Sequence, residues 1–419
     1  MEYGRTGFNQ ADMTKYLREC VMEQIDISRD VEDGEVQDII RDNVIRLSRE
    51  FYIGASERER MSREIFNSIR KLDIIQELVD DSRVTEIMVN GTENIYIEEN
   101  GHIRQWEKRF TDKEKLENVI QQIVAKCNRT INESNPIVDC RLPENGSRVN
   151  IVLDPVALNG PAVTIRRFPD HPIDMKQLIR MGSISEACAE FLRDLVITGY
   201  NIFISGGTGS GKTTFLNALS EYIPSDERIL TIEDSAELQI RGIGNLIRME
   251  TRNANVEGCN EIGIRDLIKT SLRMRPDRII VGEVRGAEAL DMLQALNTGH
   301  DGSLSTGHAN SAQDMIARLE TMVLMGMDMP LQAIRRQIAS GVDIIIHLGR
   351  LRDGSRKVLE VCEVDGMRDG EVILHPLYVY EERGEKDGRI QGDLIRKDTL
   401  KNIGKLRAGG IRSATGEGS

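Results

Sequence analysis

The stretch from Ile202 to Leu216, IFISGGTGSGKTTFL, constrains the fold of this chain more than any other. A short apolar run leads into the pattern G-x-x-x-x-G-K-[ST], and a helix is expected to begin where that pattern ends. Its glycines let successive backbone N–H groups face one anion, while Lys212 offers a mobile charge for phosphates and the Thr213 hydroxyl is a ligand for Mg²⁺. The stretch therefore predicts nucleotide binding, with these contacts: Gly206, Gly207, Thr208, Gly209, Ser210, Gly211, Lys212, Thr213 and Thr214.

Composition excludes several classes of protein. The 419 residues suffice for two or three domains, and the net charge of −13 argues against a general nucleic-acid binder, which needs clustered Lys and Arg. The six cysteines are scattered without a C-x-x-C pair, which indicates reduced thiols in a cytosolic protein. The polar N-terminus lacks the apolar core of a signal peptide, and no apolar run is long enough to span a membrane.

The pattern of apolar residues divides the chain into five segments. Residues 1–70 carry helix-spaced apolar positions, and residues 71–168 mix hairpin signals with one helix, as in a small α+β domain. The proline-bearing segment 169–174 is a predicted linker. Residues 175–380 alternate apolar strands with amphipathic helices, which predicts an α/β domain with a mostly parallel sheet. Residues 381–419, rich in Gly and charge, are expected to form a flexible polar tail.

Two predicted strands end in carboxylates, where an open α/β sheet places its ligands. Glu233 and Asp234 close the strand 228–234, although DSAE at this point equally fits a helix-capping turn. Glu283 follows the apolar strand 278–282, and Gly282 occupies the place where a typical Walker B strand carries Asp. A phosphate loop needs such carboxylates to orient water and metal, so hydrolysis is a credible function.

Histidines and arginines complete the candidate set. His300 and His308 bracket a predicted strand in Gly-flanked turns, and their polar neighbours favour phosphate sensing over a zinc site. Within TIRRF, before the linker, one guanidinium is expected to face the nucleotide, because its planar fork matches phosphate oxygens. The arginines considered are Arg141, Arg148, Arg166 and Arg167 before the linker, and Arg273, Arg275, Arg278 and Arg285 near the second carboxylate.

Four motifs in order, GGTGSGKTT (206–214), TIEDSAEL (231–238), RPDRIIVGEVRGAEA (275–289) and TGHDGSLSTGHANS (298–311), resemble the type II/type IV secretion ATPase superfamily. The amino-acid sequences of these motifs are most similar to those of the CpaF/TadA branch, which drives tight-adherence (Flp-type) pilus assembly. The resemblance implies a hexameric ring of RecA-like P-loop NTPase domains, each preceded by an α+β domain. It also implies Mg²⁺-dependent ATP hydrolysis at the cytoplasmic face of a membrane machine, through an integral membrane platform protein.

The resemblance also assigns roles to residues. The phosphate loop matches Walker A, Glu283 matches the family's Walker B glutamate, and Glu233 with Asp234 matches an acidic box that places water or metal. His300 and His308 match a histidine box that senses phosphate, and Arg148, Arg166 and Arg167 fall where the N-terminal domain reaches the nucleotide. The implied catalytic set is Glu283, Glu233, Lys212, His308 and His300, and the implied metal set is Thr213, Glu233, Asp234 and Glu283.

Two other functions share the same phosphate loop. A nucleic-acid translocase or helicase also has a RecA-like core, but the acidic balance and the 4% aromatic content count against it. A non-hydrolysing nucleotide switch would bind ATP without using Glu283.

Overall fold

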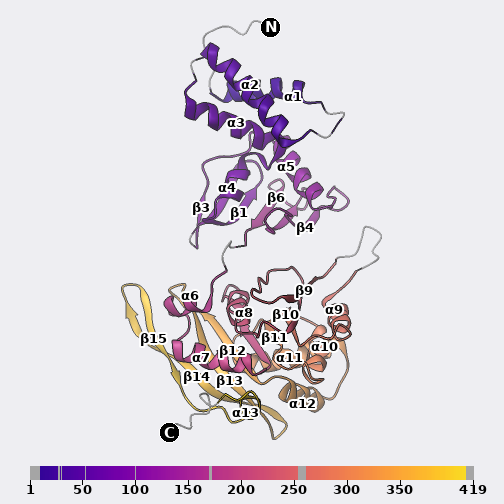
Figure 1. The fold of residues 1–419 in the computed structure, drawn as a ribbon, viewed down its shortest axis with the longest axis vertical. Coiled ribbons are helices and arrows are strands. Elements are labelled where there is room, and N and C mark those ends of the chain that lie inside the picture. Colours follow the sequence, from indigo (N-terminus) through magenta and orange to yellow (C-terminus); the bar gives the residue numbers. More distant parts are fainter. Residues whose placement is uncertain are drawn as a thin grey trace. The chain divides into compact units, whose positions relative to one another are not determined.

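The computed structural model describes residues 10–26, 29, 31–51, 53–99, 101–168, 172–252 and 261–411. The chain divides into two compact units, Met1–Asp170 and His171–Ser419, and we call them the N-terminal and C-terminal units (Figure 1). Residues 169–171 of the predicted linker lie outside the described residues, as does Cys259; the five cysteines that the structure describes are free thiols.

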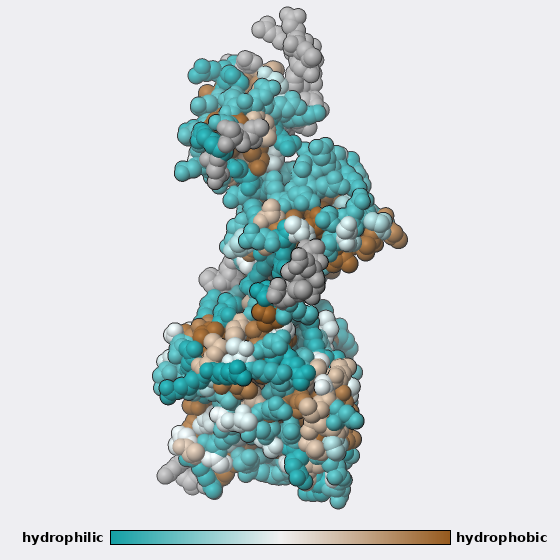
Figure 2. All heavy atoms as spheres, turned by 90° about the vertical axis from the view of Figure 1, so that its right-hand side faces the viewer, coloured by the Kyte–Doolittle hydropathy of each residue, from teal (hydrophilic) through white to brown (hydrophobic). Residues whose placement is uncertain are grey.

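The N-terminal unit begins with three helices that have a hydrophobic core of their own. They are α1 (Gln10–Gln24), α2 (Asp33–Phe51) and α3 (Ala55–Arg70). The apolar positions at helix spacing face one another, so Leu17, Ile40 and Met61 are almost completely buried while charged residues cover the outside. Hydrophilic side chains dominate the face that Figure 2 shows, in keeping with 29% charged residues.

The rest of the N-terminal unit is a six-stranded antiparallel sheet. The strand order is β3-β2-β1-β6-β5-β4. The helix α5 packs its apolar side, including Leu116 and Ile120, into the core of this sheet, and Asp112 caps its first turn by accepting from the Lys115 N–H. The elements are η1 (Asp73–Ile75), α4 (Gln76–Asp80), β1 (Val84–Asn90), β2 (Asn94–Glu99), β3 (His102–Gln105), α5 (Lys113–Lys126), β4 (Ile137–Arg141), β5 (Arg148–Val152) and β6 (Ala162–Arg166).

The C-terminal unit is built on a nine-stranded sheet with the order β15-β14-β13-β12-β7-β11-β10-β8-β9. Neighbours from β12 to β9 are parallel, and β12, β13, β14 and β15 pair antiparallel. The strands are β7 (Ile202–Gly206), β8 (Arg228–Glu233), β9 (Asn245–Glu250), β10 (Arg278–Val284), β11 (Leu304–Gly307), β12 (Ile344–Arg350), β13 (Arg356–Arg368), β14 (Glu371–Lys386) and β15 (Arg389–Arg396).

Helices cover both faces of this sheet (Figure 1). Along β7, Ile202 and Ile204 belong to one hydrophobic cluster and Phe203 to the other, as the alternation of side chains in a strand requires. The first cluster includes α6, α7 and α8, and the second includes α9 to α12. The helices are α6 (Met175–Arg180), α7 (Glu186–Ile197), α8 (Lys212–Ser220), α9 (Ile264–Ser271), α10 (Glu288–Leu296), α11 (Ala312–Gly326), α12 (Leu331–Gly341) and α13 (Gly404–Ala408).

The segment predicted as a flexible tail is largely structured, which corrects that prediction for residues 381–411. β14 continues to Lys386, β15 returns beside it, and α13 follows. Leu400 and Leu406 are buried in the main core of the C-terminal unit. Leu394, Ile403 and Ile411 pack against the same core, so apolar side chains spaced through a polar context dock the segment. Residues 412–419 lie outside the described residues.

Polar contacts hold the same segment in place. The Lys405 ammonium lies 2.7 Å from a carboxylate oxygen of Asp343 and 2.7 Å from one of Asp301. The Glu363 carboxylate, which is buried, accepts hydrogen bonds from the backbone N–H groups of Lys401 and Asn402 at 2.9 and 2.7 Å. Among the described residues, no helix combines the length and apolar character that a membrane crossing requires.

Candidate functional site

The phosphate loop lies at the carboxyl end of β7, between β11 and β12. Gly206 is required by close approach, because a Cβ there would lie 2.5 Å from the backbone oxygen of Leu348. Gly211 has a φ of 92° and precedes α8 without a side-chain cap. The first N–H groups of the helix are therefore available to an anion, as a phosphate site needs.

Lys212 folds back over its own loop. Its Nζ donates to the backbone oxygens of Gly206 and Gly207 at 3.1 Å each, and lies 3.1 Å from Nδ1 of His308. Burial lowers the pKa of Lys212, and the nearby charge of Glu283 opposes that shift. No carboxylate touches this ammonium among the described residues, so its donors are held by neutral groups that a phosphate can replace.

Glu283, near the end of β10, lies between a histidine and an arginine. Its Oε1 is 2.7 Å from Nε2 of His308, and its Oε2 accepts from Nε and Nη2 of Arg285 at 2.9 and 2.6 Å. Burial, and then the charge of Lys212, lowers the pKa of His308. A neutral ring with its proton on Nε2 satisfies both neighbours, because Nδ1 then accepts from Lys212 and Nε2–H faces the carboxylate.

Glu233, the last residue of β8, explains the unusual Gly282. Its side chain is buried, and its Oε1 accepts from the backbone N–H groups of Glu237 and Leu238 at 2.8 and 2.7 Å. A Cβ at Gly282 would lie 2.8 Å from Cγ of Glu233. The glutamate from β8 thus occupies the space beside β10 that a larger residue at position 282 would need. The same two hydrogen bonds show that Glu233, and not Asp234, binds the DSAE turn.

The chemistry of Thr213 and Glu233 fits a hydrated Mg²⁺. Oε2 of Glu233 is buried without a hydrogen-bond partner, and burial raises the pKa of this carboxyl to about 7. Thr213 stands in the first turn of α8, half-buried. No cluster of three or more His, Cys, Asp or Glu side chains preforms a cage in the described parts of the chain. This donor set suits Mg²⁺, which usually takes few protein ligands and completes its shell with water and phosphate.

The structure does not bring His300 to this site, which corrects the role predicted for it. His300 precedes β11, whereas the phosphate loop follows β7, and the two strands run parallel with Leu304 opposite Ile202. His300 therefore lies at the amino end of the sheet and His308 at the carboxyl end. Nδ1 of His300 is 3.2 Å from the backbone oxygen of Ala295, at the end of α10.

The predicted arginines belong to both units of the chain, and the structure assigns them different contacts. Arg148, Arg166 and Arg167 belong to the N-terminal unit. Arg167 donates to the backbone oxygens of Asp81 and Val84, so part of its guanidinium is committed inside that unit. The contact of any of the three with a nucleotide stays a prediction. In the C-terminal unit, Arg278 is buried in an ion pair with Glu227 and is structural, whereas Arg285 contacts Glu283.

A cavity of about 50 Å³ opens beside the phosphate loop, and sequence reasoning missed it. Arg356, at the start of β13, borders this cavity and donates from Nε to the backbone oxygen of Gly209 at 2.8 Å. No motif marks Arg356, because the pairing of β12 with β13 brings it to the loop from far along the sequence. The cavity is lined by Ile173, Leu178, Met181, Ser183, Ser210, Gly211, Thr214, Phe215, Leu348, Arg356, Lys357 and Val358.

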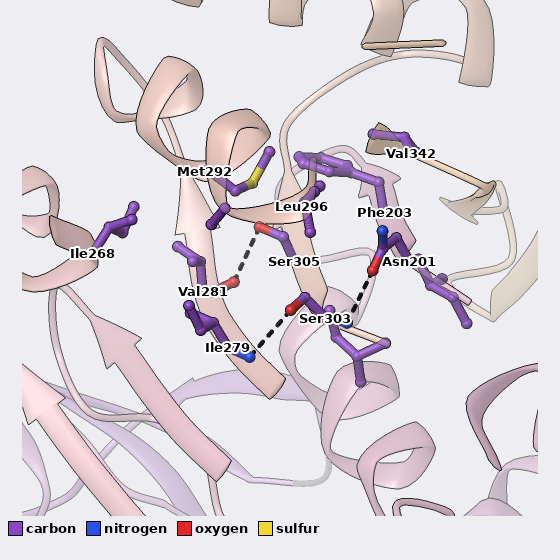
Figure 3. A pocket seen from close by; sticks show the side chains of 13 residues that line it. Asn201, Phe203, Ile268, Ile279, Val281, Met292, Leu296, Ser303, Ser305 and Val342 are labelled. Atoms are coloured by element: carbon purple, nitrogen blue, oxygen red, sulfur yellow. Dashed lines mark hydrogen bonds between the residues drawn. The ribbon is translucent and has the colours of Figure 1, made fainter. Parts of the chain in front are cut away.

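A second cavity, shown in Figure 3, is not a ligand site. It measures about 10 Å³, room for one water, and lies inside the C-terminal unit between β7, β10, β11 and α10. Its polar side chains already have partners: Ser303 Oγ accepts from the Ile279 N–H, Asn201 Oδ1 accepts from the Ser303 N–H, and Ser305 Oγ donates to the Val281 oxygen. We interpret it as a packing defect.

Comparison with known proteins agrees with the motifs. The family model described as type II/IV secretion system protein matches residues 69–388. A Mycobacterium tuberculosis protein whose name assigns it to conjugal transfer is 36% identical over 331 residues, covering 77% of this chain and 92% of its own length. The type IV secretion system protein PtlH of Bordetella pertussis is 31% identical over 310 residues, covering 68% and 91%.

A solved structure shows the same fold. The pilus retraction motor PilT with bound ADP is 20% identical and has a TM-score of 0.50, and the match covers 81% of this chain and 86% of PilT. The predicted architecture, an α+β domain followed by a RecA-like P-loop domain, is confirmed. The matched range contains the phosphate loop, Glu233, Glu283 and His308. The chain therefore belongs to the type II/IV secretion system protein family.

Proposed function

We propose that this protein is a Mg²⁺-dependent ATPase that hydrolyses ATP to ADP and phosphate. The observation that carries the proposal is the arrangement of Lys212, His308 and Glu283 beside the phosphate loop, in contacts of 2.7 and 3.1 Å. In this arrangement the phosphate-binding ammonium and a candidate base are joined through one neutral imidazole. A merely nucleotide-binding switch has no need of a carboxylate at that point.

The side chains suggest how the residues act. Phosphate oxygens replace the backbone oxygens and His308 around Lys212, so His308 is released to sense the γ-phosphate. The release of His308 also frees Oε1 of Glu283, which lies 2.7 Å from Nε2 of His308, to accept a proton from water as that water attacks the γ-phosphorus and the bond to ADP breaks. Thr213 and Glu233 would hold Mg²⁺ or its water, and Mg²⁺ would neutralise charge on the transferred phosphoryl group.

The cavity beside the loop supplies a place for the nucleobase. Its lining is mainly apolar and includes Leu178 and Phe215, which is the kind of surface that a purine ring prefers. Arg356 borders the same cavity from the phosphate-loop side, where it both supports the Gly209 carbonyl and places a positive charge near the nucleotide.

At the level of the cell, we propose a motor for pilus assembly or secretion of the CpaF/TadA branch, acting as a hexamer on an integral membrane platform protein at the cytoplasmic face of the membrane. The family match and the names of the relatives support a role in secretion, whereas the CpaF/TadA branch rests on the sequences of the four motifs alone. Arginines of the N-terminal unit, Arg148, Arg166 or Arg167, are proposed to complete the nucleotide site. The linker suggests that ATP shifts the two units relative to each other.

Two substitutions test the hydrolytic proposal. Lys212→Ala should abolish both ATP binding and turnover, because the loop loses its only ammonium. Glu283→Gln should lower the turnover number at least about 100-fold while ATP binding, measured with a fluorescent analogue, is retained. Unchanged turnover in Glu283→Gln would favour the nucleotide switch. Turnover stimulated by single-stranded DNA, and not by the platform protein in membranes, would favour a translocase.

A further inference from the structure

Arg285 connects the two acidic motifs of the site. Its guanidinium donates to Oε2 of Glu283 through two nitrogens, at 2.9 and 2.6 Å, and its Nη1 lies 3.7 Å from Oδ2 of Asp234. These residues come from the ends of neighbouring strands, Glu283 from β10 and Asp234 from the residue after β8. Asp234, Arg285 and Glu283 therefore form a continuous line of alternating charge that ends beside His308.

The contact fixes which oxygen of Glu283 is free. Both guanidinium nitrogens bind the same oxygen, Oε2, so rotation of the carboxylate is restricted and Oε1 is directed toward His308 and the phosphate loop. Only 20% of the Glu283 side chain is exposed, so few waters compete for this geometry. An oriented base is more effective than a freely rotating one, since proton transfer needs a defined approach.

The contacts of Asp234 favour support of Arg285 over direct metal binding. Its side chain is 54% exposed, and its Oδ1 accepts a hydrogen bond of 3.0 Å from the Thr251 hydroxyl. Its other oxygen faces Arg285. The buried oxygen without a partner at the end of β8 is instead Oε2 of Glu233.

We propose that Asp234 and Arg285 are positioning residues that act in series: Asp234 orients Arg285, and Arg285 orients Glu283 so that Oε1 accepts the proton of the attacking water. This proposal rests on the proposed ATPase activity. It differs from the metal role predicted for Asp234, because a residue acting in series through Arg285 has no effect once Arg285 is removed.

A double-mutant cycle on the full-length chain distinguishes the two roles. Arg285→Ala should lower the turnover number about 10- to 100-fold with little change in KM for ATP, because it disturbs the base and not nucleotide binding. Asp234→Ala should lower it by up to about fivefold, the value of an exposed ion pair. The double variant should match Arg285→Ala alone, and Arg285→Lys should restore part of the loss. The Mg²⁺ concentration for half-maximal turnover should be the same in wild type and Asp234→Ala.

Matched controls separate positioning from general effects. Arg383→Ala removes a comparably exposed arginine that pairs with Asp393 at 2.8 Å on the β14–β15 hairpin, and turnover should not change. Thermal unfolding of every variant should match that of the wild type within about 2 °C, which excludes misfolding.

Three results would overturn the proposal. If the fold-loss of turnover in the double variant equals the product of the losses in the two single variants, Asp234 acts independently of Arg285. A raised Mg²⁺ requirement in Asp234→Ala would show that it binds metal. Turnover equal to wild type in Arg285→Ala would show that the arginine contact is only a surface ion pair. If the wild type has no ATPase activity, or if Glu283→Gln keeps it, the proposed ATPase function is refuted. That outcome is distinct from the three results above, which refute only the positioning roles.

Discussion

The tight fit between Gly282 and Glu233 gives a strong test of the site, because the smallest possible enlargement should disturb it. In Gly282→Ala the new methyl group would lie 2.8 Å from Cγ and 3.3 Å from Oε1 of Glu233. Carbon atoms do not approach so closely without a shift. The Glu233 side chain cannot move freely, since its Oε1 is bound to two backbone N–H groups and the residue is only 3% exposed.

Two costs contribute to the expected loss of stability. Overpacking a tight interior by one methyl group costs about 1–3 kcal/mol. Weakening a hydrogen bond to the buried carboxyl of Glu233 adds about 1 kcal/mol, and the Leu238 N–H, which is buried, would then lack a partner. We expect Gly282→Ala to destabilise the C-terminal unit by about 3 kcal/mol, which for a unit of this size lowers its Tm by roughly 6–12 °C.

Differential scanning calorimetry of the full-length chain measures this shift. The matched control is Gly244→Ala, an exposed glycine of the same unit that has no atom within 4 Å of the added methyl and no positive φ. Its Tm should stay within about 2 °C of wild type. If Gly282→Ala melts like the control, Glu233 does not occupy the space beside β10, and the explanation for the missing Walker B aspartate is wrong.

Two further predictions concern parts of the chain away from the site. Leu406→Ala should destabilise the C-terminal unit by about 2–5 kcal/mol in urea unfolding, because Leu406 is completely buried, and a value near zero would show that the segment after β15 does not pack on the core. Asp73→Asn should stabilise the N-terminal unit at pH 7, since burial raises the pKa of Asp73 and Asn, like Asp, tolerates its φ of 49°. A raised pKa in the folded state means that stability is lost as pH rises above 3.8, so the gain should vanish near pH 4; a gain of equal size at pH 4 would contradict this reasoning.

The sequence was informative where function is encoded in neighbouring residues. The phosphate loop, the strand before it and the carboxylates after β8 and β10 each follow from a local pattern, and the structure gathers them at one edge of the sheet. His300 shows the limit of this approach. Two histidines eight residues apart resemble a pair, but a strand between them carries one to each end of the sheet.

Other features depend on contacts that no local pattern contains. β9 has a weak, half-buried pattern as the edge of the sheet, so it was not predicted. Arg356 reaches Gly209 only because β12 and β13 fold into a hairpin. Residues 381–411 have the polar composition of a flexible tail, yet Leu400 and Leu406 within this segment are buried in the core. In each case tertiary packing, and not local propensity, decides the outcome.

The balance of charge around the phosphate loop bears on how the proposed ATPase would bind a triphosphate. Around the loop, Lys212, Arg285 and Arg356 carry positive charge, whereas Glu283 and Asp234 are negative, and His308 is held neutral. Three cations against two carboxylates leave little net charge to offset a triphosphate, and Arg285 is already committed to the carboxylates. Under the proposed function, Mg²⁺ would supply part of the missing positive charge that phosphoryl transfer requires. Further positive charge from outside the loop would then raise the affinity for ATP, and the proposal that Arg148, Arg166 or Arg167 supplies it predicts weaker ATP binding when that arginine is replaced by Ala.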